Sequence, residues 1–305
     1  MTNKFEKKQL DLGMHEDILI QISYLNLAAK CWGNPEGKPL LGLHGWLDNA
    51  ATFDHLAPLM KEFRLVSLDL PGHGFSDHRP PGSSYHFIDM IVDVLEVLNI
   101  LDWDRFSLIG HSMGAGVASY IAGTVPEKID SVILIEGLGS ITQKAEMMPE
   151  TLLEATREWM KLTNKKLPIY TDFETAVKVR HSVGVISEVS ARTLVARGLK
   201  PVMGGFSWNS DPRLKVKSRH YFTEEQSLAF LKKISAPVLL IDSEENRKDL
   251  WKKSYIKRFS YIENFHRSIV NGGHHLHLDK PEDVAKAITK FVNQSINNGI
   301  QFKNK

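Results

Sequence analysis

"LIGHSMGAG", residues 108–116, is the most informative stretch of this chain, because it joins an apolar, strand-like run to a helical one. Its Gly110, Ser112 and Gly114 form the pattern G-x-S-x-G. In this pattern the serine occupies a sharp, strained turn between a strand and a helix, with its hydroxyl above the sheet. Glycines at the flanking positions let the strand and the helix pass closely. Such a pattern is common by chance, so its place between a strand and a helix is what predicts Ser112 as a nucleophile.

The segments around this stretch alternate between buried strands and helices. Short apolar runs predict strands at 39–46, 63–74, 105–112, 130–137, 236–243 and 267–273. Apolar residues at helical spacing predict one helix over 88–101, facing the core with Ile88, Ile91, Val92, Leu95 and Leu98, and a second over 281–292, with Val284, Ile288 and Phe291. This alternation predicts an α/β fold whose mostly parallel central sheet has helices on both faces. In such sheets the chemistry lies in loops beyond the carboxyl ends of the strands.

Residues 138–234 interrupt the alternation. They contain helical stretches at 149–162 and 187–199 but no buried-strand run, and the strand pattern resumes at 236. We therefore predict a helical cap, or lid, over 138–234, inserted into a core formed by 1–137 and 235–305. Helical spacing favours the core of the cap over a pocket wall for most of its large apolar residues. These are Met147, Met148, Trp159, Met160, Met203, Phe206 and Trp208.

Composition indicates an ordered chain with a large core, since 42% of its 305 residues are apolar and 24% are charged. A net charge of +2 gives no electrostatic reason to expect nucleic acid or an anionic membrane as a partner. Cys31 is the single cysteine, which excludes an internal disulfide and suits a reducing compartment. Residues 1–13 lack the apolar core of a signal peptide, and no later run approaches a membrane span. We expect a soluble cytoplasmic protein.

Four motifs together resemble the α/β-hydrolase family along nearly the whole chain. They are "LLGLHGW" (40–46), "DLPGHGFSD" (69–77), "LIGHSMGAG" (108–116) and "GGHHLHLDKPE" (272–282), in the family's order and spacing. The chain is similar to the serine-hydrolase-like branch, close to haloalkane dehalogenases and epoxide hydrolases. Those two enzyme classes carry an aspartate nucleophile at the elbow, whereas this chain has Ser112. The serine argues against both of their reactions and points to ester-type acyl transfer.

The resemblance assigns roles to several further residues. Gly273, Asp279 and Pro281 match the spacing of the family's terminal signature, which makes His274 the expected base, with His275 as a neighbour on the loop and His277 packed beside the helix. The backbone N–H groups of Trp46 and Met113 correspond to the oxyanion hole of the family. His44 and Gly45 can also form a tight turn with a packed imidazole, an interpretation that is compatible with a rigid oxyanion loop. His73 is expected to pack or form hydrogen bonds rather than take part in the reaction.

A metal site at the three histidines His274, His275 and His277 is not expected. Adjacent side chains in a loop point apart, and neither CxxC nor HExxH occurs elsewhere in the chain. The mechanism implied by the family requires no metal or organic cofactor.

The acid that orients the base departs from the commonest family pattern. That pattern places an aspartate at the position of Asn246, and an amide cannot supply the charge that stabilises an imidazolium. Some dehalogenase-like members carry the acid after the preceding strand, where this chain has Glu136. We expect Glu136 to complete a Ser-His-Glu triad; the alternatives are a salt bridge or helix cap for Glu136, with Asp242, Glu244 or Glu245 as the acid.

The reaction implied by the resemblance is cleavage of a small-to-medium apolar carboxylic ester or thioester by water, through an acyl-enzyme. Lactones and carbon–carbon bonds are open alternatives, since the same machinery cleaves them. A noncatalytic protein that binds a small ligand in a hydrolase-like pocket is a further alternative, because a fold does not settle a function. The expected partners are the substrate and water, and the oligomeric state is not determined by the sequence.

Overall fold

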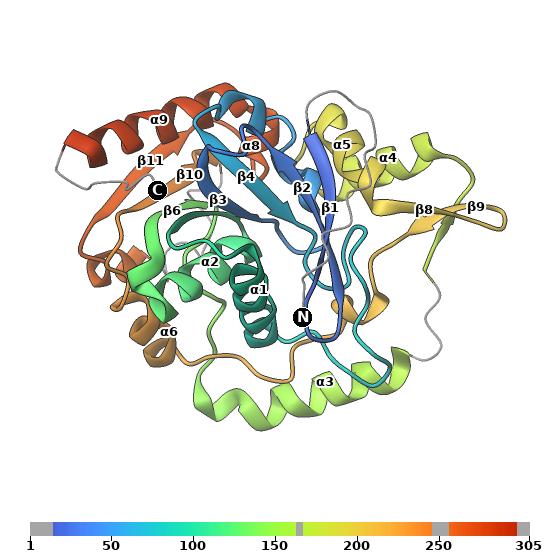
Figure 1. The fold of residues 1–305 in the computed structure, drawn as a ribbon. Helices are drawn as coiled ribbons and strands as arrows, with labels where there is room; N and C mark the ends of the chain where they lie inside the picture. The colour runs from blue at the N-terminus through green and yellow to red at the C-terminus, as the bar shows by residue number, and fades with distance from the viewer. Residues whose placement is uncertain (1–14, 163–166, 246–255, 298–305) are drawn as a thin grey trace.

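An eight-stranded sheet forms the centre of the protein in a computed structural model that describes residues 15–162, 167–245 and 256–297 (Figure 1). The strand order is β1-β2-β4-β3-β5-β6-β10-β11. The pairs β1/β2 and β2/β4 are antiparallel, and all pairs from β4 to β11 are parallel. The bounds are β1 His15–Gln21, β2 Asn26–Trp32, β3 Lys38–Leu43, β4 Phe63–Leu68, β5 Phe106–His111, β6 Ile129–Ile135, β10 Val238–Ser243 and β11 Phe265–Val270. Each of the six predicted runs overlaps a strand, with β3, β6 and β11 beginning one or two residues before their runs, whereas the β1–β2 hairpin was not predicted.

Both faces of the sheet are buried at its central strands β3, β4, β5, β6 and β10, which explains the nearly continuous apolar runs of these strands. Successive side chains of a strand point to opposite faces. Leu41 and Leu43 of β3 belong to the core cluster that includes α1 (Phe87–Leu101) and α2 (Met113–Thr124). Leu40 of the same strand belongs to the cluster that includes α9 (Pro281–Asn297). Helices therefore cover both faces, as the sequence predicts.

The buried face of α1 differs from the predicted one. Ile91 and Leu98 are buried as predicted, but Ile88 and Val92 are 48% and 53% exposed. Ile88 and Val92 lie on the same side of the helix as the polar residues Asp89, Glu96 and Asn99, and packing against the sheet and α2 buries the opposite side. The buried apolar face consists of Met90, Ile91, Val94, Val97 and Leu98. For α9 the predicted face is correct, since Val284, Ile288 and Phe291 are all buried.

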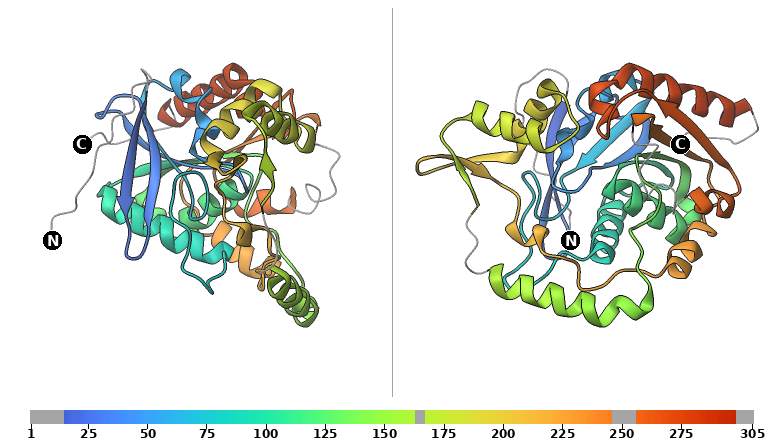
Figure 2. Two further views of the ribbon diagram at one scale, coloured as in Figure 1. Left: turned by 90° about the vertical axis from the view of Figure 1, so that its right-hand side faces the viewer. Right: turned by 180° about the vertical axis from the view of Figure 1, so that it is seen from behind.

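The segment between β6 and β10 contains strands as well as helices. Its helices are α3 (Met148–Leu162), α4 (Phe173–Val183), α5 (Glu188–Gly198) and α6 (Glu224–Leu231). A separate antiparallel sheet of order β7-β9-β8 joins Ile169–Tyr170, Gly205–Trp208 and Leu199–Val202. These strands are short and mostly not buried, so they carry no long apolar run, and the expectation of a purely helical insertion was wrong in this respect. Figures 1 and 2 show α3 along one edge of the molecule and the α4–α5 pair beside another.

The sequence predicts that most of the large apolar residues of this segment form its core, but in the structure they do not. Met147, Met160 and Met203 are 43%, 71% and 96% exposed, and the other four are only partly buried. Met203 lies in the tight turn between β8 and β9, where no other element covers it. Smaller residues of α4, α5 and their connection form the core instead, together with Leu278: Ala176, Val177, Ile186, Ala191, Leu194 and Val195.

Within the described ranges, no helix has the length and apolar character required to cross a membrane. The cytoplasmic location expected from the sequence stays a prediction.

Candidate active site

Ser112 lies at the turn between β5 and α2, in a backbone conformation that few residues adopt. Its φ is 51° and its ψ is −112°, and its N–H donates to Ile135 O at 2.9 Å. The flanking glycines are required by space. A Cβ on Gly110 would lie 2.4 Å from Gly114 O, and one on Gly114 would lie 2.1 Å from Leu43 O. The G-x-S-x-G pattern therefore has the strand–turn–helix context that a nucleophile elbow requires.

Backbone strain is concentrated around this serine. Four non-glycine residues among those described have a positive φ: Leu47 at 61°, Asp102 at 52°, Ser112 at 51° and Glu136 at 58°. Asp102 caps the end of α1. The other three follow the carboxyl ends of the adjacent parallel strands β3, β5 and β6. Strained residues persist where the surrounding structure holds them, and they cluster at functional sites.

The structure brings Glu136 and His274 together at the same edge of the sheet. His274 follows β11, and its Nδ1 lies 3.2 Å from Glu136 Oε2. The Glu136 side chain is fully buried and that of His274 is 29% exposed. Strand β10 lies between β6 and β11 and connects both loops through Ser243. The Ser243 N–H donates to Glu136 Oε1 at 2.5 Å, and its hydroxyl donates to Gly272 O.

The acids after β10 are placed differently. Asp242 is buried and accepts a hydrogen bond from Arg267 Nε at 2.7 Å. Glu244 and Glu245 are exposed, and Asn246 lies outside the described residues. Among the acidic side chains of the described ranges, Glu136 is the one in contact with His274.

The loop after β3 places the expected oxyanion donors at the amino-terminal end of α2. Met113 is the first residue of α2, and a Cβ on Gly114 would contact both Leu43 O and His44 O, so this loop lies against the elbow. Neither the Trp46 N–H nor the Met113 N–H has a hydrogen-bond acceptor within the described part of the chain. The indole of Trp46 is 52% exposed and donates to Leu214 O at 3.0 Å.

Two buried histidines hold this loop in place, as the sequence interpretation allowed. His44 Nδ1 donates to Gly45 O at 2.7 Å, and its Nε2 accepts from the Leu70 N–H at 3.0 Å. His73 Nε2 accepts from the Leu47 N–H at 3.3 Å. Burial lowers the pKa of His44 to about 4 and that of His73 to about 3. Both rings are therefore neutral at neutral pH, and the prediction that His73 is packed and hydrogen-bonded is confirmed.

The three clustered histidines make different polar contacts, although the rings of all three lie beside the ring of His111. His277 is fully buried, its Nε2 lies 2.7 Å from Thr52 Oγ1, and burial lowers its pKa well below the usual range. His275 is buried as well, with its Nε2 3.2 Å from Asp48 Oδ2. The expectation that His275 is only a neighbour on the loop misses this contact.

A buried polar cluster adjoins the elbow, and the sequence analysis did not find it. It consists of Asp48, His111, His275 and Arg180, which we call the Asp48 cluster. Ligand-type atoms of Asp48, His111 and His275 lie within 4.8 Å of one another. Arg180 Nη2 already contacts two of these residues, at 2.8 Å from Asp48 Oδ1 and 3.2 Å from His275 Nε2. Asp48 lies two residues after the "HGW" motif and His111 lies in the elbow motif, so their positions in the sequence could have identified them. Arg180 lies in no motif, and no sequence signal could have identified it.

Electrostatics of the Asp48 cluster follow from burial and charge. Burial would raise the pKa of Asp48, but His275 and Arg180, which lie beside its carboxylate, hold it well below its usual range. Burial lowers the pKa of His111 to about 4. The cluster therefore combines an ionised aspartate, a neutral His111 and the guanidinium of Arg180.

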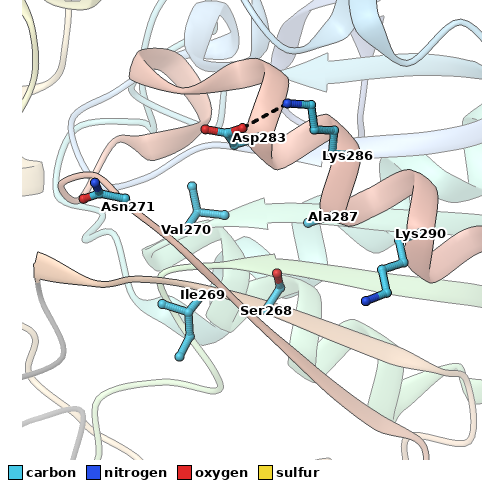
Figure 3. Close-up of a pocket in the computed structure, with 8 residues that line it drawn as sticks. All are labelled: Ser268, Ile269, Val270, Asn271, Asp283, Lys286, Ala287 and Lys290. Carbon is cyan, nitrogen blue, oxygen red and sulfur yellow. Dashed lines mark hydrogen bonds and ion pairs between the residues drawn. The ribbon is translucent and has the colours of Figure 1, made fainter.

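A surface groove of about 330 Å³ lies between the end of β11 and α9. Figure 3 shows the residues that line it. Its walls include Ile269, Asn271, Asp283 and Lys286. Ser112, Glu136 and His274 do not line it, so the groove does not identify a substrate.

The chain belongs to the alpha/beta hydrolase fold family, whose sequence profile matches residues 38–281. It is 34% identical over 280 residues to the serine hydrolase-like protein of Danio rerio, covering 87% of this chain and 85% of that protein. It is 30% identical over 305 residues to serine hydrolase-like protein 2 of Homo sapiens, covering 92% and 95%. The expected branch of the family is thereby confirmed, and the relatives support a hydrolase.

Solved structures agree with this placement. The hypothetical protein PA1622 from Pseudomonas aeruginosa PAO1 is 40% identical, with a TM-score of 0.85 over 93% of this chain and 100% of that chain. The thioesterase domain from the curacin biosynthetic pathway is 27% identical, with a TM-score of 0.77 over 94% of this chain and 100% of that chain.

Proposed function

We propose that this protein is a serine hydrolase that cleaves small-to-medium apolar carboxylic esters or thioesters through an acyl-enzyme. The observation that carries the proposal is the contact of 3.2 Å between His274 Nδ1 and the buried Glu136 Oε2, at the sheet edge where Ser112 occupies its strained turn. A carboxylate on Nδ1 holds the imidazole in the tautomer whose Nε2 can accept a proton.

In the proposed mechanism, Ser112 Oγ attacks the carbonyl carbon while His274 Nε2 takes its proton. Glu136 stabilises the imidazolium without itself becoming protonated. The carbonyl oxygen becomes an oxyanion, and the N–H groups of Trp46 and Met113 donate to it. His274 then returns the proton to the departing alkoxide or thiolate. Water attacks the acyl-enzyme in the same way, and the acid is released with Ser112 regenerated.

The oxyanion hole is proposed on two backbone donors, the N–H groups of Trp46 and Met113, that lack protein acceptors among the described residues. Fixed donors stabilise charge that appears only in the transition state, without solvent reorganisation. The neutral His44 and His73 support the loop that carries Trp46, since each accepts a backbone N–H on one nitrogen.

Residues 138–234 are proposed to act as the cap that determines the substrate, with 1–137 and 235–305 as the core. The Met- and Trp-rich composition of this segment is the basis for proposing an apolar acyl or aryl group. Similarity to a thioesterase domain at 27% identity adds thioesters to the substrates that should be tested.

Labelling with a fluorophosphonate probe tests the nucleophile, because the reaction requires an activated serine. We expect the wild-type protein to be labelled and Ser112→Ala not to be, and we expect the variant to lose at least about 10³-fold in hydrolysis of p-nitrophenyl esters or acyl-CoA thioesters. Circular dichroism checks that the variant is folded. A wild-type protein that resists the probe and hydrolyses neither substrate class, yet binds small apolar ligands, would favour the noncatalytic alternative.

Comparison of Glu136→Gln with Glu245→Gln tests the acid. Glu136→Gln preserves the shape and removes the charge beside His274, so the rate of acylation should fall by several orders of magnitude. Glu245 is exposed, and its substitution should leave the rate unchanged. The reverse result would place the acid in the loop after β10.

A further inference from the structure

The Asp48 cluster combines two loops and the end of strand β5 in the core with one helix of the insertion. Asp48 follows β3, His111 precedes Ser112, and His275 follows His274, whereas Arg180 comes from α4. The Asp48 side chain is 2% exposed and that of Arg180 is 17% exposed. Within the described ranges, Arg180 is the permanently charged group that contacts Asp48. A buried carboxylate that loses such a partner is strongly destabilised.

The hydrogen-bond pattern explains why the cluster needs this cation. His111 Nε2 lies 2.9 Å from the backbone oxygen of His274, and a carbonyl can only accept, so Nε2 carries the proton. Because burial keeps His111 neutral, its Nδ1 holds a lone pair. That nitrogen faces Asp48 Oδ2 at 3.6 Å, an arrangement of two electron-rich atoms. The guanidinium of Arg180 supplies the positive charge that stabilises the Asp48 carboxylate.

Both loops of the proposed chemistry are held by this one guanidinium. The Asp48 N–H donates to Gly45 O at 3.1 Å and closes the turn that contains Trp46. His275 adjoins His274, and a Cβ on Gly273 would lie 2.4 Å from Val185 Cγ1 in the connection between α4 and α5. Movement of α4 therefore acts on the oxyanion loop and on the loop of the base together.

We propose that Arg180 is a positioning residue for acyl transfer: through Asp48 and His275 it aligns the oxyanion loop with His274, so that the insertion must be docked for the site to be competent. This inference rests on the proposed function. Arg180 does not touch the reacting atoms, and its effect is expected in kcat rather than in KM. A misplacement of catalytic groups by about 1 Å can cost on the order of 10²-fold in rate.

A metal at Asp48, His111 and His275 is the competing interpretation of the cluster. Arg180 Nη2 lies within 3.2 Å of two of these residues, so it would have to leave before an ion could bind. The structure therefore favours the guanidinium as the cation of the cluster.

The test compares Arg180→Ala, Arg180→Lys and Gly184→Ala with the wild-type chain. A Cβ on Gly184 would lie 2.4 Å from Arg180 Nη1, so this third variant displaces the guanidinium without removing it. Gly184 has an extended backbone that alanine readily adopts. Arg192→Ala is the control, because Arg192 pairs with Glu174 on the exposed surface of the same helix pair.

The readout is steady-state hydrolysis of p-nitrophenyl butyrate, with kcat expressed per serine labelled by a fluorophosphonate. We expect kcat to fall about 10- to 100-fold in Arg180→Ala, with KM changed by less than about threefold. Arg180→Lys should recover part of this loss, since it restores the charge but not the fork of donors. Gly184→Ala should show an intermediate loss and covers the case in which Arg180→Ala does not fold. Arg192→Ala should stay within about twofold of the wild type.

Three results would overturn the inference. If the wild type is labelled and Arg180→Ala and Gly184→Ala keep its kcat, Arg180 does not position the site, and the proposed function stands. If the wild-type chain is neither labelled nor active, the proposed function fails and the positioning role fails with it. If calorimetry shows tight binding of Zn²⁺ by the wild-type chain, the Asp48 cluster is a metal site.

Discussion

Acidification from about pH 7.5 to about pH 5.5 should destabilise the fold, because the core buries several histidines in their neutral form. Burial lowers the pKa values of His44 and His111 to about 4 and that of His73 to about 3. The unfolded chain exposes the same rings, where a histidine has a pKa of about 6.5. Unfolding therefore takes up protons below about pH 6.5, and stability falls as the pH falls through this window.

The magnitude follows from the difference in protonation. At about pH 5.5 an unfolded histidine is roughly nine-tenths protonated while the buried ring is neutral, which costs about 1.4 kcal/mol for each ring. Three rings together cost about 4 kcal/mol, a large part of the ~5–15 kcal/mol that typically stabilises a domain. His277 acts in the same direction. Asp69 acts against it, because burial raises its pKa and the folded state then takes up a proton more readily on acidification.

Urea unfolding followed by tryptophan fluorescence measures the free energy of unfolding at each pH. His73→Gln isolates one ring and should reduce the pH-dependent loss by about 1.4 kcal/mol, whatever it does to stability at pH 7.5. His220→Gln is the matched control, since His220 is exposed and its substitution should leave the slope unchanged. A free energy of unfolding that is flat between these pH values, or an identical slope in His73→Gln, would refute the reasoning.

Three further substitutions separate the elbow, the base and the core. Gly114→Ala should lower the melting temperature and abolish fluorophosphonate labelling, because its Cβ would lie 2.1 Å from Leu43 O; labelling at the wild-type rate would contradict this close packing. His274→Ala should lose at least about 10³-fold in ester hydrolysis per folded molecule, whereas His277→Ala should lose mainly thermal stability, and an inactive but stable His277→Ala would reverse the assignment. Asp242→Asn should leave Arg267 without its ionic partner and lower stability while sparing kcat, and loss of kcat without loss of stability would count against Glu136 as the acid.

The order of the elements could be predicted from the sequence because it depends on local patterns. A parallel strand with both faces buried has an apolar residue at almost every position, and this pattern located the five strands β3, β4, β5, β6 and β10, whereas the edge strand β11 shows it only in part. The glycines around Ser112 reflect close approaches between neighbouring segments, so the elbow was recognisable from a few residues. Glu136 stood out because it ends an apolar strand, and the structure places its carboxylate 3.2 Å from His274.

Other features depend on which surfaces meet, and only the tertiary structure decided them. The apolar residues of α1 extend beyond the face that packs, and contact with the sheet and α2 left Ile88 and Val92 outside, on the side of Asp89 and Glu96. The β7–β9–β8 sheet has short strands with little buried surface, so its sequence lacks the signal that identified the central strands. Arg180 contacts Asp48 across 132 positions of sequence and His275 across 95. No local pattern encodes such a pairing, because the burial that makes the charges interact strongly exists only after the insertion packs onto the core.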